Sequence, residues 1–440
     1  MAEFFIQMEN LFKNKKALLL ILFFLLSFQL FYSFLYPTHG TNSINNKAWL
    51  SLTEVISHRK SPLDVSENSL VAKAYVIFAR YYVNADGGQY ILLANNFPNY
   101  YIGNNPVILD RPLYSFLIAA TAFLPRLFFD SYATLFASAI FLNFVLGFFS
   151  VVLFYYLCEK LINSRIAILS SLLLIFSPSF HLWIVQPMPE MFTVFMVIAP
   201  LYFLYNYIKN PSRSKLIIFS LIIGIFLLGK MLFFSSIFIL ISAFYFRRYK
   251  EGVIFLIIHL IPLFLWYLFV IKALKIPYFV NEVADYGVGT WLFNIFRWPW
   301  YKTMEIFLSV LPKFISIVIY GFLLLPVIFA AIGFKKITFK NGKFFCSIFV
   351  LSFLLLIFMM NAYSPRYGFW IYPVIYPLAV LGIDRVADFL KKYKNPAEGG
   401  KLDSCFARIK NWYAYIFYFV AYFSIIAVSN ADFYRFISYG

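Results

Sequence analysis

Charged residues are scarce in this chain. Only 13% of its 440 residues are Asp, Glu, Lys or Arg, whereas soluble domains average about 25%. Cysteines number three, which excludes a secreted scaffold held by disulfides. Hydrophobic residues make up 62% of the chain and aromatic residues 22%, which excludes a water-soluble domain and a disordered chain. The composition is typical of a protein that crosses a membrane several times.

Several motifs with well-defined chemistry are also absent. The chain contains no P-loop, HExxH, CxxC or GxGxxG sequence, and its four histidines are scattered. Nucleotide-driven transport and zinc chemistry therefore have no support. A net charge of +18 suggests nucleic acid in a soluble protein. Here it has a topological explanation, because basic residues gather in cytoplasmic loops, and we expect no nucleic-acid partner.

Long apolar runs recur along the whole chain. They predict an all-α polytopic membrane protein with about eleven transmembrane helices. The expected spans are 17–36, 132–157, 166–184, 191–208, 216–228, 231–246, 253–271, 314–334, 344–360, 368–383 and 412–430. The runs 216–228 and 231–246 are short for two spans, but a single span here would invert the orientation of every later segment. A hairpin of two half-length helices with Gly229 and Lys230 at its outer tip fits the charges better.

The segment 112–129 is apolar but contains Pro125 and Arg126, and the charge distribution decides its role. If it lies on the outer surface as an interfacial helix, 22 of the 37 Lys and Arg residues fall on one side of the membrane. The positive-inside rule assigns that side to the cytoplasm. Its segments are the N-terminus, 158–165, 209–215, 247–252, 335–343 and 384–411. We therefore predict a plasma (inner) membrane protein with a cytoplasmic N-terminus and a large first extracytoplasmic loop over 37–131 that contains interfacial helices.

The first outer loop carries the strongest group of candidate functional residues. Asp86 begins the stretch Asp-Gly-Gly-Gln-Tyr90, and Asp110-Arg111-Pro-Leu-Tyr114 follows before the interfacial segment. A carboxylate in a wet loop suits acid or base chemistry. The alternative explanation is that Asp-Gly simply forms a turn.

Three further candidates lie at the expected outer ends of other spans. Glu190 follows Pro189 at a corner, Lys230 lies among apolar residues, and Arg366 precedes Tyr367 and a proline-rich span. Placing an ionisable residue among apolar residues of a membrane protein costs free energy, so such a residue is a functional candidate. An Arg can also bind phosphate through paired hydrogen bonds. The alternatives are a helix N-terminus for Glu190, snorkelling for Lys230 and headgroup anchoring for Arg366.

The order of these segments resembles the GT-C superfamily of integral-membrane glycosyltransferases, which includes protein O-mannosyltransferases and aminoarabinose transferases. The resemblance lies in layout more than in long identical motifs, and it extends from the first helix to about residue 385. It rests on the basic N-terminus, Asp86 ahead of Tyr90, Asp110-Arg-Pro-Leu-Tyr114, the Ser177-Pro-Ser span, the Met188-Pro-Glu190 corner, Gly229-Lys230 and Pro365-Arg366-Tyr367. Residues 1–385 would then form the catalytic transmembrane module, and 386–440 a cytoplasmic basic loop and the last span.

The resemblance implies transfer of a sugar from a polyprenyl-phosphate donor to a lipid, glycan or protein acceptor on the extracytoplasmic face. We expect the reaction to invert the configuration at the anomeric carbon of the sugar. Asp86 and Glu190 would be the catalytic carboxylates, with Asp86 as the base, and Lys230 and Arg366 would meet the carrier phosphate. The remaining substrate-binding candidates are Tyr90, Asp110, Arg111, Tyr114 and Tyr367.

No residue pattern demands a metal ion. If a divalent cation such as Mg²⁺ or Mn²⁺ takes part, Asp86 and Glu190 would supply its oxygen ligands. Two other functions stay open. A polymerase or ligase for lipid-linked glycans would concentrate arginines in large outer loops, and a transporter or flippase of lipid-linked sugars would show repeats and broken helices around midplane charges. The chain has few such arginines and no detectable repeat.

Overall fold

The architecture is that of a computed structural model. It describes residues 14–35, 85–95, 112–129, 132–177, 180, 183–229, 248–272, 298–302, 304–305, 308, 325–337, 342, 344–346 and 371–394. Within these ranges the chain forms helices joined by turns, with no β-strand, as the apolar runs predict. Several of the expected spans extend beyond the described residues, so the total of about eleven stays a prediction.

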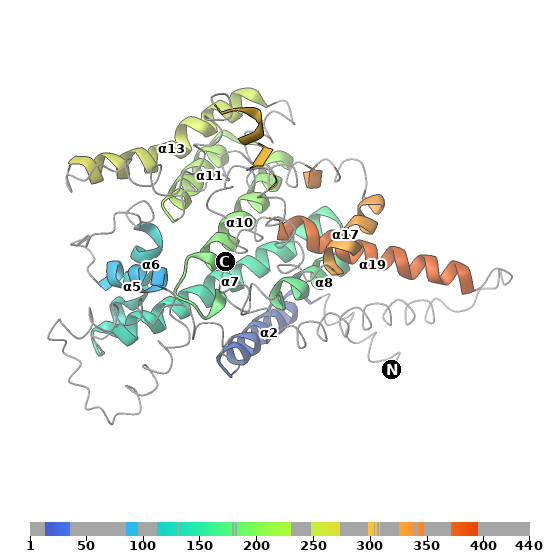
Figure 1. The fold of residues 1–440 in the computed structure, drawn as a ribbon, viewed down its shortest axis with the longest axis horizontal. Helices are drawn as coiled ribbons and strands as arrows, with labels where there is room; N and C mark the ends of the chain where they lie inside the picture. Colours follow the sequence, from blue (N-terminus) through green and yellow to red (C-terminus); the bar gives the residue numbers. More distant parts are fainter. Residues whose placement is uncertain are drawn as a thin grey trace.

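Within the described residues, the chain forms ten helices and one short 3-10 turn, whose arrangement is drawn in Figure 1. They are α2 (Lys15–Leu35), α5 (Ala85–Asn95), α6 (Pro112–Arg126), α7 (Tyr132–Leu161), α8 (Ser164–Ile175), α10 (Glu190–Lys209), α11 (Arg213–Leu227), α13 (Tyr249–Lys272), α17 (Leu325–Gly333), η4 (Phe334–Lys336) and α19 (Tyr372–Lys394).

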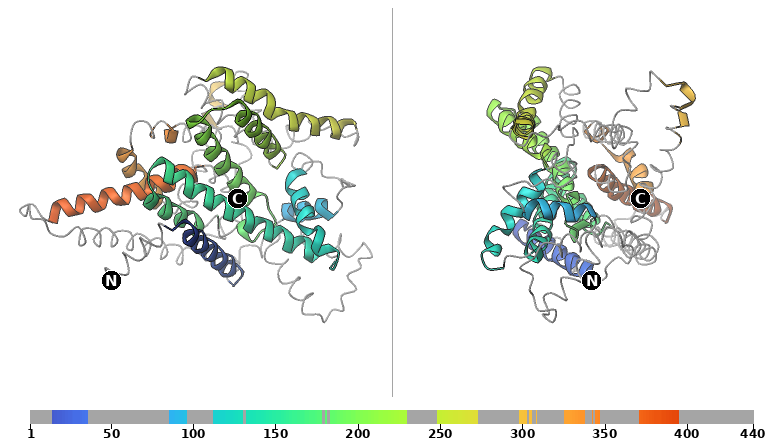
Figure 2. Two further views of the ribbon diagram at one scale, coloured as in Figure 1. Left: turned by 180° about the vertical axis from the view of Figure 1, so that it is seen from behind. Right: turned by 60° about the vertical axis from the view of Figure 1, so that its left-hand side comes forward.

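Helix α7 is the centre of the bundle, since α2, α5, α6, α8 and α10 all pack against it. Figure 1 shows α5 and α6 beside one end of α7 and α8 beside the other. The right-hand view of Figure 2 places α11 and α13 on one flank and α17 and α19 on the opposite flank. Residues three or four apart on α7 form its buried stripe: Leu135, Ala139, Asn143, Leu146, Ser150 and Phe154.

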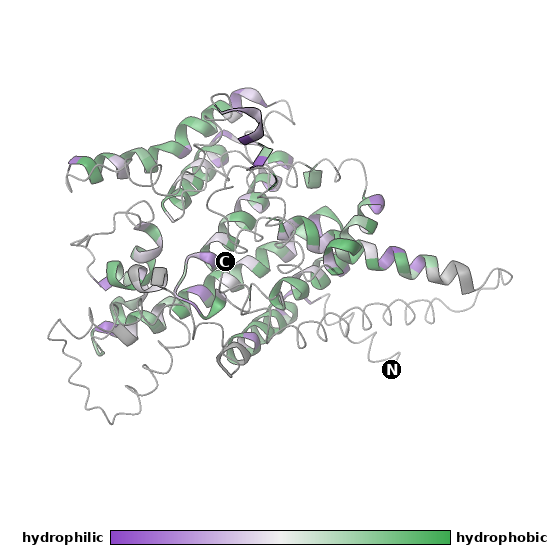
Figure 3. Ribbon diagram, viewed as in Figure 1, coloured by the Kyte–Doolittle hydropathy of each residue, from purple (hydrophilic) through white to green (hydrophobic). Residues whose placement is uncertain are grey.

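Among the described residues, three helical segments are long and apolar enough to cross a membrane: Thr134–Leu161, Glu190–Lys209 and Tyr249–Lys272. Hydrophobic residues cover most of α13 (Figure 3), and many of them are exposed. Large exposed apolar surface is unfavourable in water but not in lipid. The exposed large residues of α13 include Val253, Ile257, Ile261, Phe264, Leu265 and Phe269.

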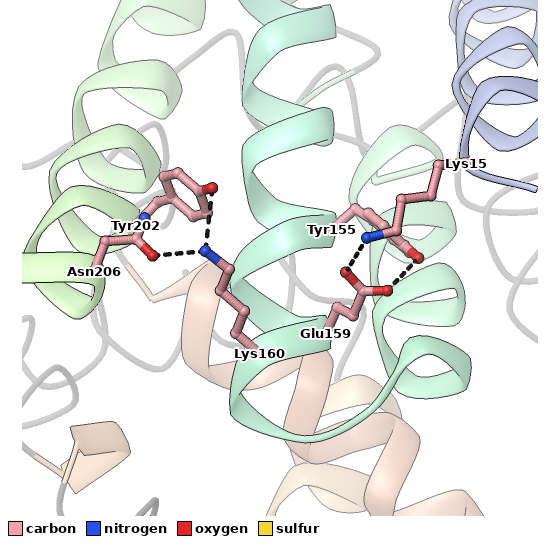
Figure 4. Close-up of polar contacts among 6 residues, drawn as sticks. All are labelled: Lys15, Tyr155, Glu159, Lys160, Tyr202 and Asn206. Atoms are coloured by element: carbon pink, nitrogen blue, oxygen red, sulfur yellow. Dashed lines mark hydrogen bonds and ion pairs between the residues drawn. The ribbon is translucent and has the colours of Figure 1, made fainter. Parts of the chain in front are cut away.

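Residues of the predicted cytoplasmic segments contact one another at one end of the bundle, which we call the basic end. Lys15 of α2 pairs with Glu159 of α7 at 3.6 Å, which joins the N-terminal segment to 158–165 (Figure 4). Lys160 donates to Asn206 Oδ1 at 2.6 Å, which adds the end of α10 (Figure 4). Arg165 pairs with Asp384 at 3.4 Å.

The remaining basic segments join the same end. Arg248, just before α13, lies 5.9 Å from the ring centre of Tyr207 near the end of α10. Lys336 after α17 pairs with Asp388 of α19 at 2.6 Å. These contacts bring residues of five predicted cytoplasmic segments to the basic end, and the sixth segment, 209–215, begins at Lys209, the last residue of α10. The side of the membrane that this end faces stays a prediction.

Helices α11 and α13 are parallel. Phe219 packs on Phe255 with ring centroids 5.7 Å apart, and one and a half turns later Gly224 faces the backbone of His259. Both helices therefore start at the basic end. Residues 230–247 lie outside the described residues, so the hairpin interpretation stays a prediction. His259 is buried, with its Nδ1 3.0 Å from the Phe255 carbonyl oxygen, so it is a packed core residue.

Two expected boundaries are wrong. The span predicted at 166–184 is not one continuous helix, since α8 ends at Ile175. The physical reason is Pro178, because a proline disfavours helical conformation at the residue before it, here Ser177. The last described helix, α19, continues past 383 to Lys394. Contacts with other elements hold this part of α19, since Asp384 pairs with Arg165 and Arg385 donates to the Ile332 carbonyl. The predicted domain boundary at 385/386 lies within α19, and the division into two units stays a prediction.

Candidate functional site

Helix α10 places Glu190 at the opposite end of the bundle from the basic residues. Glu190 is its first residue and Lys209 its last. A helix of 20 residues spans about 30 Å, which is the thickness of the hydrocarbon layer. Glu190 therefore lies near the level of the far membrane surface, which we call the site end. It is 1% exposed.

The corner that leads into α10 is fastened to α7 by one side chain. The amide nitrogen of Asn143 donates to the Gln186 carbonyl and, at 3.5 Å, to the Trp183 carbonyl. Thr193 then donates its hydroxyl to the Pro189 carbonyl at 2.9 Å inside the first turn of α10. Asn143, Gln186 and Glu190 are all buried. The corner at 183–190 is thus a buried, hydrogen-bonded part of the core.

Tyr114 of α6 meets the same amide from the other side. Its hydroxyl donates to Asn143 Oδ1 at 2.9 Å. The ring of Tyr90 of α5 packs edge-on against it, with centroids 5.3 Å apart at 87°. Burial raises the pKa of Tyr114 well above its usual value, and the negative charge of nearby Glu190 raises it further. Tyr114 therefore stays protonated at ordinary pH and remains a donor.

Helix α5 approaches the corner through a residue without a side chain. A Cβ added to Gly87 would lie 3.0 Å from Pro187 Cγ and 3.3 Å from the Pro187 carbonyl oxygen. The backbone of α5 therefore packs directly on the corner that carries Glu190. Asp86 precedes Gly87 in the first turn of this helix, so the explanation of Asp-Gly as an isolated turn is wrong. The structure describes the backbone of Asp86 and not its side chain.

The end of α11 completes the arrangement. The backbone N–H of Leu113 in α6 donates to the Leu228 carbonyl at 3.0 Å. Gly229 lies so close to Phe192 in the first turn of α10 that an added Cβ would overlap the ring. Lys230 is the next residue in the sequence and lies outside the described residues. Helices α5 and α6 of the first loop, the corner before α10 and the end of α11 therefore meet in one place.

Five sequence-predicted site residues lie outside the described residues: Asp110, Arg111, Lys230, Arg366 and Tyr367. Arg111 immediately precedes α6, and α19 begins shortly after Tyr367. Tyr372, the first residue of α19, lies about 18 Å along this helix from Asp384, which is at the basic end. The roles of all five residues stay predictions.

Sequence reasoning missed Asn143. The available signal was an amide in the middle of the expected span 132–157, where an unpaired polar group is expensive. Among the described side chains no group of three or more His, Cys, Asp or Glu residues lies together in a way that could hold a metal ion.

Comparison with known proteins places the chain in a structural class. No protein-family model and no curated protein matches the sequence. The structure of ArnT from Cupriavidus metallidurans bound to undecaprenyl phosphate matches with a TM-score of 0.52 at 15% identity, over 84% of this chain and 74% of ArnT. Its apo state matches over the same shares at the same identity, with a TM-score of 0.50. The chain has the GT-C fold.

The archaeal oligosaccharyltransferase AglB from Archaeoglobus fulgidus, in complex with an inhibitory peptide and a dolichol-phosphate, is also similar. It matches with a TM-score of 0.48 at 13% identity, over 84% of this chain and 55% of AglB. The fold assignment rests on ArnT. It confirms the resemblance seen in the sequence at the level of the GT-C fold.

Proposed function

We propose that this chain transfers a sugar from a polyprenyl-phosphate donor to an acceptor on the extracytoplasmic face of the plasma membrane. The observation that carries the proposal is the convergence of α5, α6, the 183–190 corner and the end of α11 around buried Glu190. The GT-C fold supports it, and the ArnT structure holds undecaprenyl phosphate.

The position of the helix ends favours an anionic substrate. Helices α5, α6 and α10 all begin at the site end, so the positive ends of three helix dipoles point toward one region. A phosphate group suits such a region. Lys230 and Arg366 add full positive charges, which stabilise the negative charge that develops on the phosphate as its bond to the sugar breaks. The phosphate then needs no general acid.

The acceptor hydroxyl needs a base, and Asp86 has this role. Asp86 accepts the hydroxyl proton while the acceptor oxygen forms its bond to the anomeric carbon and the bond to the phosphate oxygen breaks. One such displacement inverts the configuration of the sugar. Glu190 faces the same region from α10 and assists in orienting the acceptor. Tyr90, Asp110, Arg111, Tyr114 and Tyr367 line or support the substrate site.

The proposed chemistry does not depend on a metal ion, because Lys230 and Arg366 supply the positive charge. If Mg²⁺ or Mn²⁺ takes part, the oxygen atoms of Asp86 and Glu190 are the ligands it would use. Transfer measured with and without EDTA tests this point. Unchanged transfer in EDTA supports a reaction without a metal.

The test of the proposal is the product formed by the purified protein in detergent. Incubation with a radiolabelled polyprenyl-phosphate sugar and candidate lipid, glycan or protein acceptors should move label from the carrier to an acceptor. The anomeric configuration of the product, read by NMR, should be inverted. A protein that moves the lipid-linked sugar across vesicle membranes without cleaving it would be a flippase and would contradict the proposal.

A further inference from the structure

Asn143 is buried within α7 and joins two parts of the chain that are far apart in sequence. Its side chain is 0% exposed. The oxygen accepts from Tyr114 at the start of α6, while the nitrogen donates to the backbone of Trp183 and Gln186 before α10. An asparagine offers a donor and an acceptor on one short side chain. Neither aspartate nor leucine can make both sets of bonds.

We propose that Asn143 is a positioning residue that fixes the active-site corner at 183–190 to the first-loop helix α6. The proposal rests on the proposed function, because it assigns Asn143 a part in sugar transfer through Glu190 and not through substrate contact.

The chain of contacts gives the mechanism of positioning. The Gln186 carbonyl held by Asn143 lies four residues before Glu190, and the intervening Pro187 packs against Gly87 of α5. A shift of the corner therefore moves Glu190 and the helix that carries Asp86 together. Tyr114, held by the same amide, lies near the Glu190 carboxylate. A misplacement of about 1 Å at a reacting group can cost about 10²-fold in rate.

Two variants separate the two sides of Asn143. Asn143→Asp keeps the acceptor for Tyr114 and loses the donors to the corner, whereas Tyr114→Phe loses the bond to α6 and leaves the corner held. Amide hydrogen exchange in the full-length detergent-purified protein should quicken over 183–193 in Asn143→Asp and over the start of α6 in Tyr114→Phe. The expected change is about tenfold, the factor for one buried hydrogen bond. Asn143→Leu should quicken exchange in both regions.

Kinetics then show whether positioning matters for transfer. Asn143→Leu should lower kcat for sugar transfer about 10²-fold, with less than a threefold change in the affinity for undecaprenyl phosphate used as a binding probe. Ser150→Ala is the matched control. Ser150 is equally buried on α7, but its hydroxyl donates only to the Leu146 carbonyl of its own helix at 2.7 Å. This control should leave exchange over 183–193 and kcat unchanged.

Three results would overturn the proposal. They are wild-type exchange and kcat in Asn143→Leu, an equal loss of kcat in Ser150→Ala, and a loss of undecaprenyl phosphate affinity as large as the loss of kcat. The last result would make Asn143 a binding residue. Absence of transfer by the wild-type protein would contradict the proposed function instead. The exchange pattern of the variants would then decide by itself whether Asn143 holds the corner.

Discussion

Residues that the sequence singled out acquire a common location in the structure. Tyr90, Tyr114 and Glu190 come from three helices and lie together in the core of the site end. Their places in the first-loop and corner motifs, together with the GT-C resemblance, identified them as candidates. Asn143 was overlooked because its importance depends on two backbone carbonyls far away in sequence, and no local pattern reports such a contact.

At this scale the carrier phosphate gives a direct prediction. Arg366→Lys keeps the charge but loses the planar pair of donors, so the affinity for undecaprenyl phosphate should fall even for this mild change. Lys230→Met should also weaken binding, because it removes a positive charge from an apolar environment. Both affinities can be measured by titration of the purified variants.

The control for this prediction is Lys160→Met. Lys160 lies at the basic end, bonded to Asn206 and far from the site end, and its loss should leave carrier affinity unchanged. Wild-type binding in both Arg366→Lys and Lys230→Met would remove the phosphate role and favour headgroup anchoring and snorkelling instead.

Whole helices depart from the sequence expectation where a local signal competes with a long apolar run. Helix α8 stops before Ser177-Pro178 although the apolar run continues, because the proline outweighs hydropathy there. Helix α19 continues beyond its apolar part because tertiary contacts with Arg165, Ile332 and Lys336 support its polar half. Such contacts cannot be read from a single sequence.

Helix packing leads to a prediction about α17 and α19. Gly333 and Gly382 allow the two backbones to touch: a Cβ on Gly382 would lie 1.9 Å from the Phe329 carbonyl oxygen. Small residues permit such close approach between membrane helices. Gly382→Ala should therefore lower stability by about 1–3 kcal/mol, seen as a lower Tm in detergent.

Gly342→Ala is the comparison for that measurement. Among the described residues, a Cβ at Gly342 would meet the Ile337 side chain, at 3.2 Å, and a side chain can move aside. Its Tm should stay near that of the wild type. An equal Tm for Gly382→Ala and the wild type would mean that α17 and α19 do not approach as closely as described.

The molecule as a whole is polarised along α7 and α10. Counting basic residues was sufficient to group the six predicted cytoplasmic segments. Ion pairs, a hydrogen bond and a cation-π contact bring residues from five of them to the basic end, and the sixth begins at the end of α10. The grouping was predictable because loop charge is a local property of the sequence. The meeting of α5, α6, α10 and α11 at the opposite end was predictable only through the resemblance to GT-C enzymes, since it depends on which helix faces pack together.

Orientation in the membrane follows as a test at this scale. In a variant without Cys158, Cys346 and Cys405, a cysteine introduced at Ser131 should react with an impermeant thiol reagent added to intact cells. One at Ser164, which is exposed at the basic end, should react only after the cells are opened. Labelling of position 164 in intact cells would invert the topology and place the site in the cytoplasm.

The most direct test of sugar transfer with Asp86 as the base is the rate of transfer by Asp86→Asn. Asparagine keeps the size of the side chain but cannot take the acceptor's proton, and base catalysis contributes about 10²–10⁴-fold. The account predicts a loss of turnover of at least about 10²-fold with near-normal affinity for undecaprenyl phosphate, whereas Asp110→Asn should mainly weaken binding. Transfer by Asp86→Asn at the wild-type rate would contradict the account.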